Sequence, residues 1–293
     1  MMTIVSHDAG GAEILSEWLR VKNKKFNLCL KGPAIKIFKK KFNNKNNLNF
    51  YKVLKESKLI LTGSSWPSRF EVKAIKYAIK KNIKVITFLD HWINYKLRFY
   101  LNKKLIFPNE IWVGDKFAFN LAKKEIPNTK IFLKKNIYIE NKIKNLKKIQ
   151  KKFKEENILY LCSPIIKNNF YKKNNALFKY NERKLLLYFL KNIKYLKIKY
   201  KKIIVRPHPS ENIKKYHWLK RKHDKNIKIS KNKKLEEDIA SSKVVLGFNS
   251  NAMVISSIVG KKVFNVSPLG KKANILPFKK ILNFNKIVNR KND

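Results

Sequence analysis

Residues 203–211, IIVRPHPSE, join an apolar segment to a rigid polar turn. The apolar, β-branched run 203–205 is typical of a buried strand. The two prolines fix their own φ angles and keep the residue before each of them extended, so His208 is held in a defined place at the end of this strand. Ligands of parallel α/β sheets bind at the carboxyl ends of the strands. If the strand belongs to such a sheet, as the alternation of strands and helices along the chain indicates, this turn is a candidate site.

The pattern of an apolar strand followed by a polar turn recurs in the N-terminal half. Strands are predicted at 2–6, 26–30, 58–65, 84–90, 110–115 and 130–136, and helices at 12–20, 69–82 and 116–126. Strands that alternate with amphipathic helices indicate parallel βαβ units. Polar residues collect where the strands end, in the segments SHDAGG, TGSSW, LDHW and VGD. Half of the chain is thus predicted to form one doubly wound sheet.

The alternation begins again after a charged segment. Strands are predicted at 157–164, 201–209, 226–230, 243–251 and, as the last, 261–267; helices are predicted at 183–196, 235–242 and 252–260. The lysine- and asparagine-rich runs 39–47 and 167–175 are predicted to be loops. We therefore predict an α/β fold of two Rossmann-like domains that face each other across a cleft. The N-terminal domain is 1–140, a linker or connecting helix is 141–156, and the C-terminal domain is 157–293.

The net charge is the most prominent feature of the composition. Lys and Arg number 69 against 19 Asp and Glu, which gives +50 over 293 residues. Such a charge suits binding to nucleic acid. However, the basic residues are nearly all lysine and are spread over the whole chain, whereas proteins that read nucleic-acid sequence favour arginine for bidentate contacts. We expect a solvated lysine surface with no specific nucleic-acid partner. This surface would also adhere to anionic membrane headgroups.

The sequence also predicts a location for the protein. No apolar stretch reaches the roughly 18–20 residues of a membrane span, and the N-terminus lacks the pattern of a signal peptide. The two cysteines match neither a disulfide framework nor a metal-ligand spacing. We expect a cytoplasmic protein with reduced thiols, peripheral to the inner face of the membrane.

Two segments of the C-terminal half carry candidate binding residues. His208 can donate a hydrogen bond to a phosphate or act as an acid or base near neutral pH. Glu211 is predicted either to be the partner of a helix N-cap or to contact the nucleotide. Asn249-Ser250-Asn251 precedes a helix whose first N–H groups suit phosphate oxygens. A serine or asparagine there is also an ordinary N-cap.

Two segments of the N-terminal half carry candidate bases. His7 and Asp8 follow the first strand, and either could deprotonate a hydroxyl, although Asp8 could instead cap the next helix. Asp90 ends another strand beside aromatic residues that suit a sugar ring, or simply pack there. The sequence contains no carboxylate cluster with metal-ligand spacing, so no metal site is predicted.

These residues resemble those of a known enzyme class. The segments ILYLCSP, RPHPSE, NSNAM and GKKVF are similar to the C-terminal half of GT-B nucleotide-sugar enzymes. In particular, the chain resembles the bacterial sialyltransferase/polysialyltransferase and capsule Kdo-transferase groups, which carry a His-Pro motif and a later serine motif. CDP-glycerol-type polymer transferases show a comparable RPHP. His208-Pro209 matches the His-Pro motif and Ser250 the serine motif, but the usual paired serine is replaced by Asn249-Ser250-Asn251.

The resemblance implies a function and a set of donor contacts. It implies a metal-independent glycosyltransferase of surface polysaccharide or glycolipid synthesis, which moves a nonulosonic acid or Kdo from a CMP- or UDP-linked donor to a glycan or lipid-linked acceptor. The donor is a substrate, so no cofactor is expected. The nucleotide contacts would be Arg206, His208, Pro209, Glu211, Asn249, Ser250 and Asn251. The alternatives are an epimerase or hydrolase of the same fold, a CDP-glycerol-type transferase and, from another class, a nucleic-acid-binding protein.

Overall fold

The computed structural model divides the chain into two compact units. Unit 1 is Met1–Glu140 and unit 2 is Asn141–Asp293. The structure describes residues 1–43, 46–65, 68–165, 180–209, 211–219, 226–231, 234–267, 276 and 278–289. The predicted loop 167–175 lies outside the described residues.

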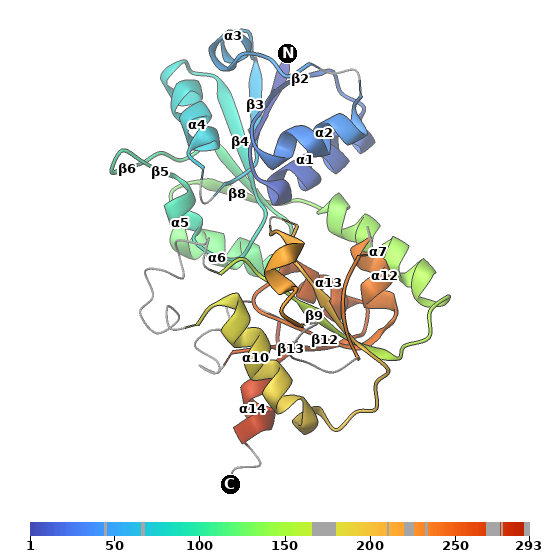
Figure 1. The fold of residues 1–293 in the computed structure, drawn as a ribbon. Helices are drawn as coiled ribbons and strands as arrows, with labels where there is room; N and C mark the ends of the chain where they lie inside the picture. Colours follow the sequence, from blue (N-terminus) through green and yellow to red (C-terminus); the bar gives the residue numbers. More distant parts are fainter. Residues whose placement is uncertain are drawn as a thin grey trace. The chain divides into compact units, whose positions relative to one another are not determined.

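Unit 1 is built on a six-stranded sheet in the order β2-β1-β3-β4-β7-β8, in which every pairing is parallel. The strands are β1 (Met2–Ser6), β2 (Phe26–Leu30), β3 (Leu59–Thr62), β4 (Lys84–Leu89), β7 (Glu110–Val113) and β8 (Lys130–Leu133). The helices are α1 (Ala9–Lys22), α2 (Pro33–Lys41), α3 (Phe50–Lys55), α4 (Phe70–Lys80), α5 (Tyr95–Arg98) and α6 (Lys116–Glu125), with a small hairpin of β5 (Tyr100–Leu101) and β6 (Lys104–Leu105). Figure 1 shows α1 and α2 on one face of this sheet and α4 on the other.

The core of unit 1 explains why the strands read as continuous apolar runs. All five residues of β1 are buried, because helices cover both faces of the sheet. Ile4 and Leu28 from neighbouring strands pack in one cluster with Ile14 and Leu15 of α1. The apolar residues of α1 repeat with the period of an α-helix, so these side chains lie on one face of it.

Unit 2 repeats the architecture with its own parallel sheet, in the order β11-β10-β9-β12-β13-β14. The strands are β9 (Asn157–Leu161), β10 (Ile203–Arg206), β11 (Ile227–Ile229), β12 (Ser242–Gly247), β13 (Lys262–Asn265) and β14 (Ile281–Asn283). The helices are α10 (Glu182–Asn192), α12 (Leu235–Ala240), α13 (Asn251–Ile258) and α14 (Phe284–Asn289), with 3-10 turns η1 (Ile193–Leu196) and η2 (Ile213–Tyr216). One face of this sheet packs against α10 and α14 through the aromatic rings of Tyr160, Phe189, Phe264 and Phe284.

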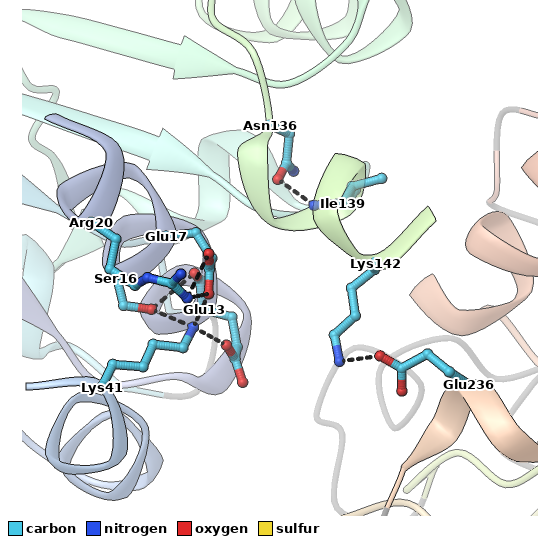
Figure 2. Close-up of polar contacts among 9 residues, drawn as sticks. All are labelled: Glu13, Ser16, Glu17, Arg20, Lys41, Asn136, Ile139, Lys142 and Glu236. Atoms are coloured by element: carbon cyan, nitrogen blue, oxygen red, sulfur yellow. Dashed lines mark hydrogen bonds and ion pairs between the residues drawn. The ribbon is translucent and has the colours of Figure 1, made fainter. Parts of the chain in front are cut away.

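Helix α7 (Ile137–Gln150) contains the boundary between the two units. At its start, Asn136 Oδ1 accepts the backbone N–H of Ile139 at 3.1 Å. Further along, within unit 2, Lys142 Nζ donates to Glu236 Oε1 of α12 at 2.7 Å, as Figure 2 shows. Leu146 is buried. The charged segment after residue 140 is therefore helical up to Gln150.

The sequence-based fold class, α/β with two Rossmann-like domains, is confirmed by these two parallel sheets. Two details of the prediction are wrong. The run 39–47 is not all loop, because α2 continues to Lys41, where Phe38 is buried and stacks on Phe42. The strand at 261–267 is not the last, because β14 pairs with β13 beyond it. No helix among the described residues is long and apolar enough to cross a membrane.

Candidate functional site

The strand order of unit 1 creates a switch point between β1 and β3. The chain proceeds from β1 to β2 in one direction and from β3 to β4 and β7 in the other, and ligands of open α/β sheets bind at such a point, outside the carboxyl ends of the strands. His7 and Asp8 follow β1, Ser64 follows β3, and Asp90 follows β4. The structure thus brings the predicted base candidates of unit 1 to one edge of the sheet.

His7 and Asp8 form a hydrogen-bonded pair. His7 Nδ1 lies 2.6 Å from Asp8 Oδ1, and both side chains are 28% exposed. An ionised carboxylate only accepts hydrogen bonds, so Nδ1 carries the proton of this contact, and in the neutral ring Nε2 then keeps a lone pair. Asp8 occupies the N-cap position of α1, but its side chain makes no capping hydrogen bond. Its carboxylate is hydrogen-bonded to His7 instead. The pair has the arrangement of a base and the carboxylate that orients it.

Gly32 makes room for the His7 ring. This glycine has φ +55°, and a Cβ built on it would lie 2.8 Å from His7 Nε2 and 2.9 Å from Cε1. Any side chain there would press on the nitrogen that carries the lone pair. The close approach of the backbone therefore defines where the reactive edge of the imidazole lies.

His91 has the opposite tautomer. Its Nδ1 accepts the backbone N–H of Trp92 at 2.9 Å, so a neutral His91 ring carries its proton on Nε2 and offers a donor. The ring proton therefore lies on different nitrogens in these two histidines, on Nδ1 in His7 and on Nε2 in a neutral His91.

Asp90 is held in a buried ion pair. Arg98 Nη1 donates to Asp90 Oδ1 at 2.8 Å and to the carbonyl and hydroxyl of Ser64 at 2.7 and 2.9 Å. The side chains of Arg98 and Asp90 are 6% and 11% exposed. Asp90 Oδ2 lies against the first turn of α1, where a Cβ on Gly10 would fall 2.0 Å away. These contacts favour a role for Asp90 in holding the strand ends together.

Glu71 was missed by the sequence analysis. It lies in the first turn of α4 and is 3% exposed. Its Oε1 accepts the backbone N–H of His7 at 2.7 Å, 64 positions away in sequence. Burial raises the pKa of Glu71 to about 8, opposed by the hydrogen bond from His7 and assisted by the charges of Asp8 and Asp90. A glutamate in a first helical turn is common because it complements the helix dipole, so the sequence held no signal that sets Glu71 apart.

In unit 2 the switch point lies between β9 and β12, because β10 and β11 extend to one side and β13 and β14 to the other. Arg206 ends β10, and the Asn249-Ser250-Asn251 segment follows β12. Ser163, just after β9, donates to the carbonyl of Phe248 at 2.6 Å and ties the two strand ends together. The residues predicted to contact the nucleotide of the sugar donor therefore lie at the carboxyl edge of the second sheet.

His208 and Glu211 build the RPHP turn. The Glu211 N–H donates to the His208 carbonyl at 2.8 Å, and the His208 N–H donates to Glu211 Oε2 at 3.4 Å. The Glu211 carboxylate also accepts from Tyr216 at 2.8 Å and Lys215 at 2.7 Å. Burial lowers the pKa of His208, against the opposing charge of Glu211. Glu211 thus supports the turn, and His208 is neutral at pH 7.

Arg206 is engaged in an ion pair with a residue of α12. Its Nη1 lies 2.5 Å from Oδ2 of Asp238, which is fully buried in α12. Ser230 donates to the same carboxylate oxygen at 2.6 Å. The structure therefore gives Arg206 a role in joining β10 to α12, and its predicted contact with a nucleotide stays a prediction.

The Asn249-Ser250-Asn251 segment forms the start of α13. Ser250 is the N-cap, and its Oγ accepts the N–H of Ala252 at 3.3 Å. Asn249 has φ +48°, a left-handed conformation that asparagine tolerates, and its N–H donates to Asn265 Oδ1 at 3.1 Å. Asn251 Oδ1 is buried without a hydrogen-bond partner within the described part of the chain. Ser250 is a helix cap, as one interpretation of the sequence held, and this helix start also presents N–H groups that suit an anion.

Comparison with known proteins supports the fold. The chain resembles a solved structure assigned as a UDP-N-acetylglucosamine 2-epimerase from Listeria monocytogenes, with a TM-score of 0.56 and 10% identity over 90% of this chain and 78% of that one. The wall teichoic acid polymerase TagF matches with a TM-score of 0.48 and 12% identity over 90% and 69% of the two chains. No protein-family model and no curated protein sequence matches this chain. The likeness to the first of these structures and the two parallel sheets show the GT-B type of fold, with two Rossmann-like units.

Among the residues that the structure describes, no group of three or more His, Cys, Asp or Glu side chains is arranged to hold a metal ion. Of the carboxyl groups near His7, that of Asp8 pairs with the His7 ring, that of Glu71 accepts from the His7 amide and that of Asp90 pairs with Arg98.

Proposed function

We propose that this protein is a glycosyltransferase of surface polysaccharide or glycolipid biosynthesis. It transfers a sugar, a nonulosonic acid or Kdo, from a CMP- or UDP-linked donor to an acceptor hydroxyl. Unit 2 binds the nucleotide part of the donor and unit 1 binds the acceptor. The GT-B fold and the sequence resemblance support this class of enzyme. The polar groups at both switch points support the assignment of the nucleotide to unit 2 and of the acceptor to unit 1.

The His7–Asp8 pair is the observation that carries the proposal. The 2.6 Å contact from Nδ1 to Asp8 leaves Nε2 free of the ring proton. In the reaction, Nε2 takes the proton of the acceptor hydroxyl while the acceptor oxygen bonds to the anomeric carbon of the sugar. The bond from that carbon to the donor phosphate breaks, and its electron pair leaves with the phosphate. Asp8 stabilises the imidazolium that forms.

Unit 2 would stabilise the leaving phosphate. A neutral His208 is a hydrogen-bond donor through a ring N–H, and the helix start at Ser250 offers backbone N–H groups and the positive end of the α13 dipole. Donors fixed before the reaction are effective because they need no reorganisation as charge develops. This arrangement favours a role for His208 in binding phosphate rather than in accepting a proton.

Thermal unfolding in the presence of nucleotides tests the proposal. CMP, CDP, UDP and GDP are compared, and the cognate nucleotide should raise Tm in a concentration-dependent way. His208→Ala should abolish that rise, while the matched variant of the exposed His217, His217→Ala, should retain it. An unchanged rise in His208→Ala would overturn the donor site, and the absence of a rise with every nucleotide would count against the function.

A second candidate function is a nucleotide-sugar epimerase or hydrolase. Such enzymes need several acid or base groups around the sugar, and unit 1 gathers three carboxyl groups, Asp8, Glu71 and Asp90, near His7. The fold neighbour assigned as a 2-epimerase favours the same candidate. Incubation with the donor alone separates the two functions: epimerised or hydrolysed donor in the absence of acceptor supports the second.

The surface charge suits work near a membrane. With a net charge of +50, the protein would be drawn to the anionic cytoplasmic leaflet, where lipid-linked acceptors are found. Co-sedimentation with vesicles tests this part of the proposal. Binding should require anionic lipid and weaken with salt, because the attraction is screened over about 8–10 Å at physiological ionic strength.

A further inference from the structure

We propose that Glu71 is a positioning residue for the His7–Asp8 pair: it acts through the backbone of His7, as a hydrogen-bond acceptor that must stay uncharged. The proposal rests on the proposed function insofar as it concerns activity. Its structural part, the control of His7 by Glu71, is independent of the reaction catalysed.

The first support is the contact between Glu71 and His7. Glu71 Oε1 accepts the His7 N–H at 2.7 Å, at the residue where β1 gives way to the turn before α1. The backbone of His7 sets the direction of its side chain, and so the approach of Nδ1 to Asp8. A carboxyl group that is 97% buried is a firm anchor, because it has no water to exchange for this hydrogen bond.

The second support is the charge around Glu71. Asp8 at the start of α1 and Asp90 at the end of β4 both act on Glu71 through their charge and oppose its ionisation. Of the cations on the surrounding elements, Arg98 is paired with Asp90, and Lys31 lies over the ring of Phe70, 5.1 Å from its centroid. Ionised Glu71 would therefore stand as a buried carboxylate beside the carboxylates of Asp8 and Asp90.

The third support is the second oxygen of Glu71. Glu71 Oε2 is buried and has no hydrogen-bond partner among the described residues. A buried carboxylate oxygen without a donor is costly, whereas a protonated carboxyl group carries no charge there. The proton is placed on Oε2, since Oε1 accepts from His7. At pH 7 Glu71 is thus a neutral acid, consistent with its pKa of about 8.

Ionisation of Glu71 should therefore disturb the His7–Asp8 pair. The new charge repels the Asp8 carboxylate, which is the partner of His7 Nδ1. We expect activity to fall as the pH rises through about 8. An amide at position 71 keeps an oxygen for the His7 N–H and does not ionise, so it should preserve the pair at higher pH.

The experiment compares Glu71→Gln, Glu71→Ala and the unchanged protein. The ring signals of the histidines are followed by NMR from pH 6 to 10, with the His7 signal identified by its loss in His7→Gln. The unchanged protein should show an inflection near pH 8 in the His7 signal, absent from the signal of the exposed His217 and absent in Glu71→Gln. A His7 signal without that inflection, or with the same one in Glu71→Gln, overturns the proposal.

Activity gives a separate readout. Glu71→Gln should lose the alkaline decline, so that the ratio of its activity at pH 9 to its activity at pH 7 exceeds that of the unchanged protein, while Glu71→Ala should be weaker than Glu71→Gln at every pH. An unchanged alkaline decline in Glu71→Gln, or a Glu71→Gln protein as impaired as Glu71→Ala at pH 7, overturns the proposal. If the protein transfers no sugar at all, the proposed function fails, and the NMR titration still decides the role of Glu71.

Discussion

Arg98 and Asp90 form an ion pair 2.8 Å long between side chains that are both nearly inaccessible to solvent. The same guanidinium donates to the carbonyl and hydroxyl of Ser64, so one arginine joins the ends of β3 and β4. This relationship is the reason that Asp90, one of the three base candidates found in the sequence, is better suited to holding the site than to chemistry.

Removal of Arg98 should therefore destabilise the protein strongly. Arg98→Ala leaves the Asp90 carboxylate buried without its partner, which typically costs about 3–5 kcal/mol. Urea unfolding measures the loss. Arg20→Ala is the matched control, since Arg20 is 58% exposed in its pair with Glu17 and should cost less than about 1 kcal/mol. Similar losses in the two variants would contradict the structural role of Arg98.

Substitution of Gly32 should impair activity more than stability. In Gly32→Ala, the new Cβ meets His7 Nε2 at 2.8 Å and is also strained by a positive φ. Gly260→Ala separates the two effects, because Gly260 has φ +89° and no atom within 4 Å of the added Cβ. The backbone strain alone costs about 1–3 kcal/mol. Gly32→Ala should lose somewhat more stability than Gly260→Ala in thermal unfolding, because the His7 ring must also shift, but only Gly32→Ala should lose most of its transferase activity.

Replacement of Ser250 should weaken nucleotide binding as well as the helix. Ser250→Ala removes the cap of α13, for a cost of about 1 kcal/mol. Asn181→Ala removes a comparable cap, because Asn181 Oδ1 accepts the N–H of Lys184 at the start of α10. Thermal shifts with the cognate nucleotide should shrink in Ser250→Ala and stay intact in Asn181→Ala. Equal shifts in both would leave Ser250 with a capping role only and remove it from the donor site.

The raised pKa of Glu71 predicts a pH-dependent effect on stability. The folded protein holds the Glu71 proton up to about pH 8, while the unfolded chain releases it near 4.5. The stabilisation is therefore complete below pH 4.5 and is lost as the pH rises towards 8, with a slope of up to about 1.4 kcal/mol per pH unit. Glu71→Gln removes this dependence. The free energy of unfolding of the variant minus that of the unchanged protein should therefore increase from pH 5.5 to pH 7.5.

Urea unfolding at the two pH values checks this prediction. The quantity compared is the difference between variant and unchanged protein, in which the titration of all other groups cancels. Glu56→Gln, at an exposed position, should show the same difference at both pH values. A constant difference for Glu71→Gln would mean that Glu71 is ionised in the folded protein at pH 5.5.

Local sequence was sufficient for the fold class and for part of the candidate site. Buried parallel strands are apolar on both faces, so segments such as 157–161 and 243–247 stand out from the helices between them. His7 and Asp8 are adjacent in the chain, and their place after β1 follows from the end of its apolar run. Two elements with weak sequence patterns were not predicted correctly. Strand β14 is only three residues long, and α2 is rich in lysine and has only two buried residues, Ala34 and Phe38.

Only the tertiary structure decided which of these residues act together. Glu71 meets His7 across 64 positions, and Arg98 meets Ser64 across 34. Such contacts depend on the order of the strands in the sheet, which periodicity does not encode, because periodicity reports only on neighbours within one element. The sequence alone determined two Rossmann-like units with polar strand ends; the packing of those ends decided that His7 pairs with Asp8, that Asp90 is held by Arg98 and that Glu71 is buried against the His7 amide.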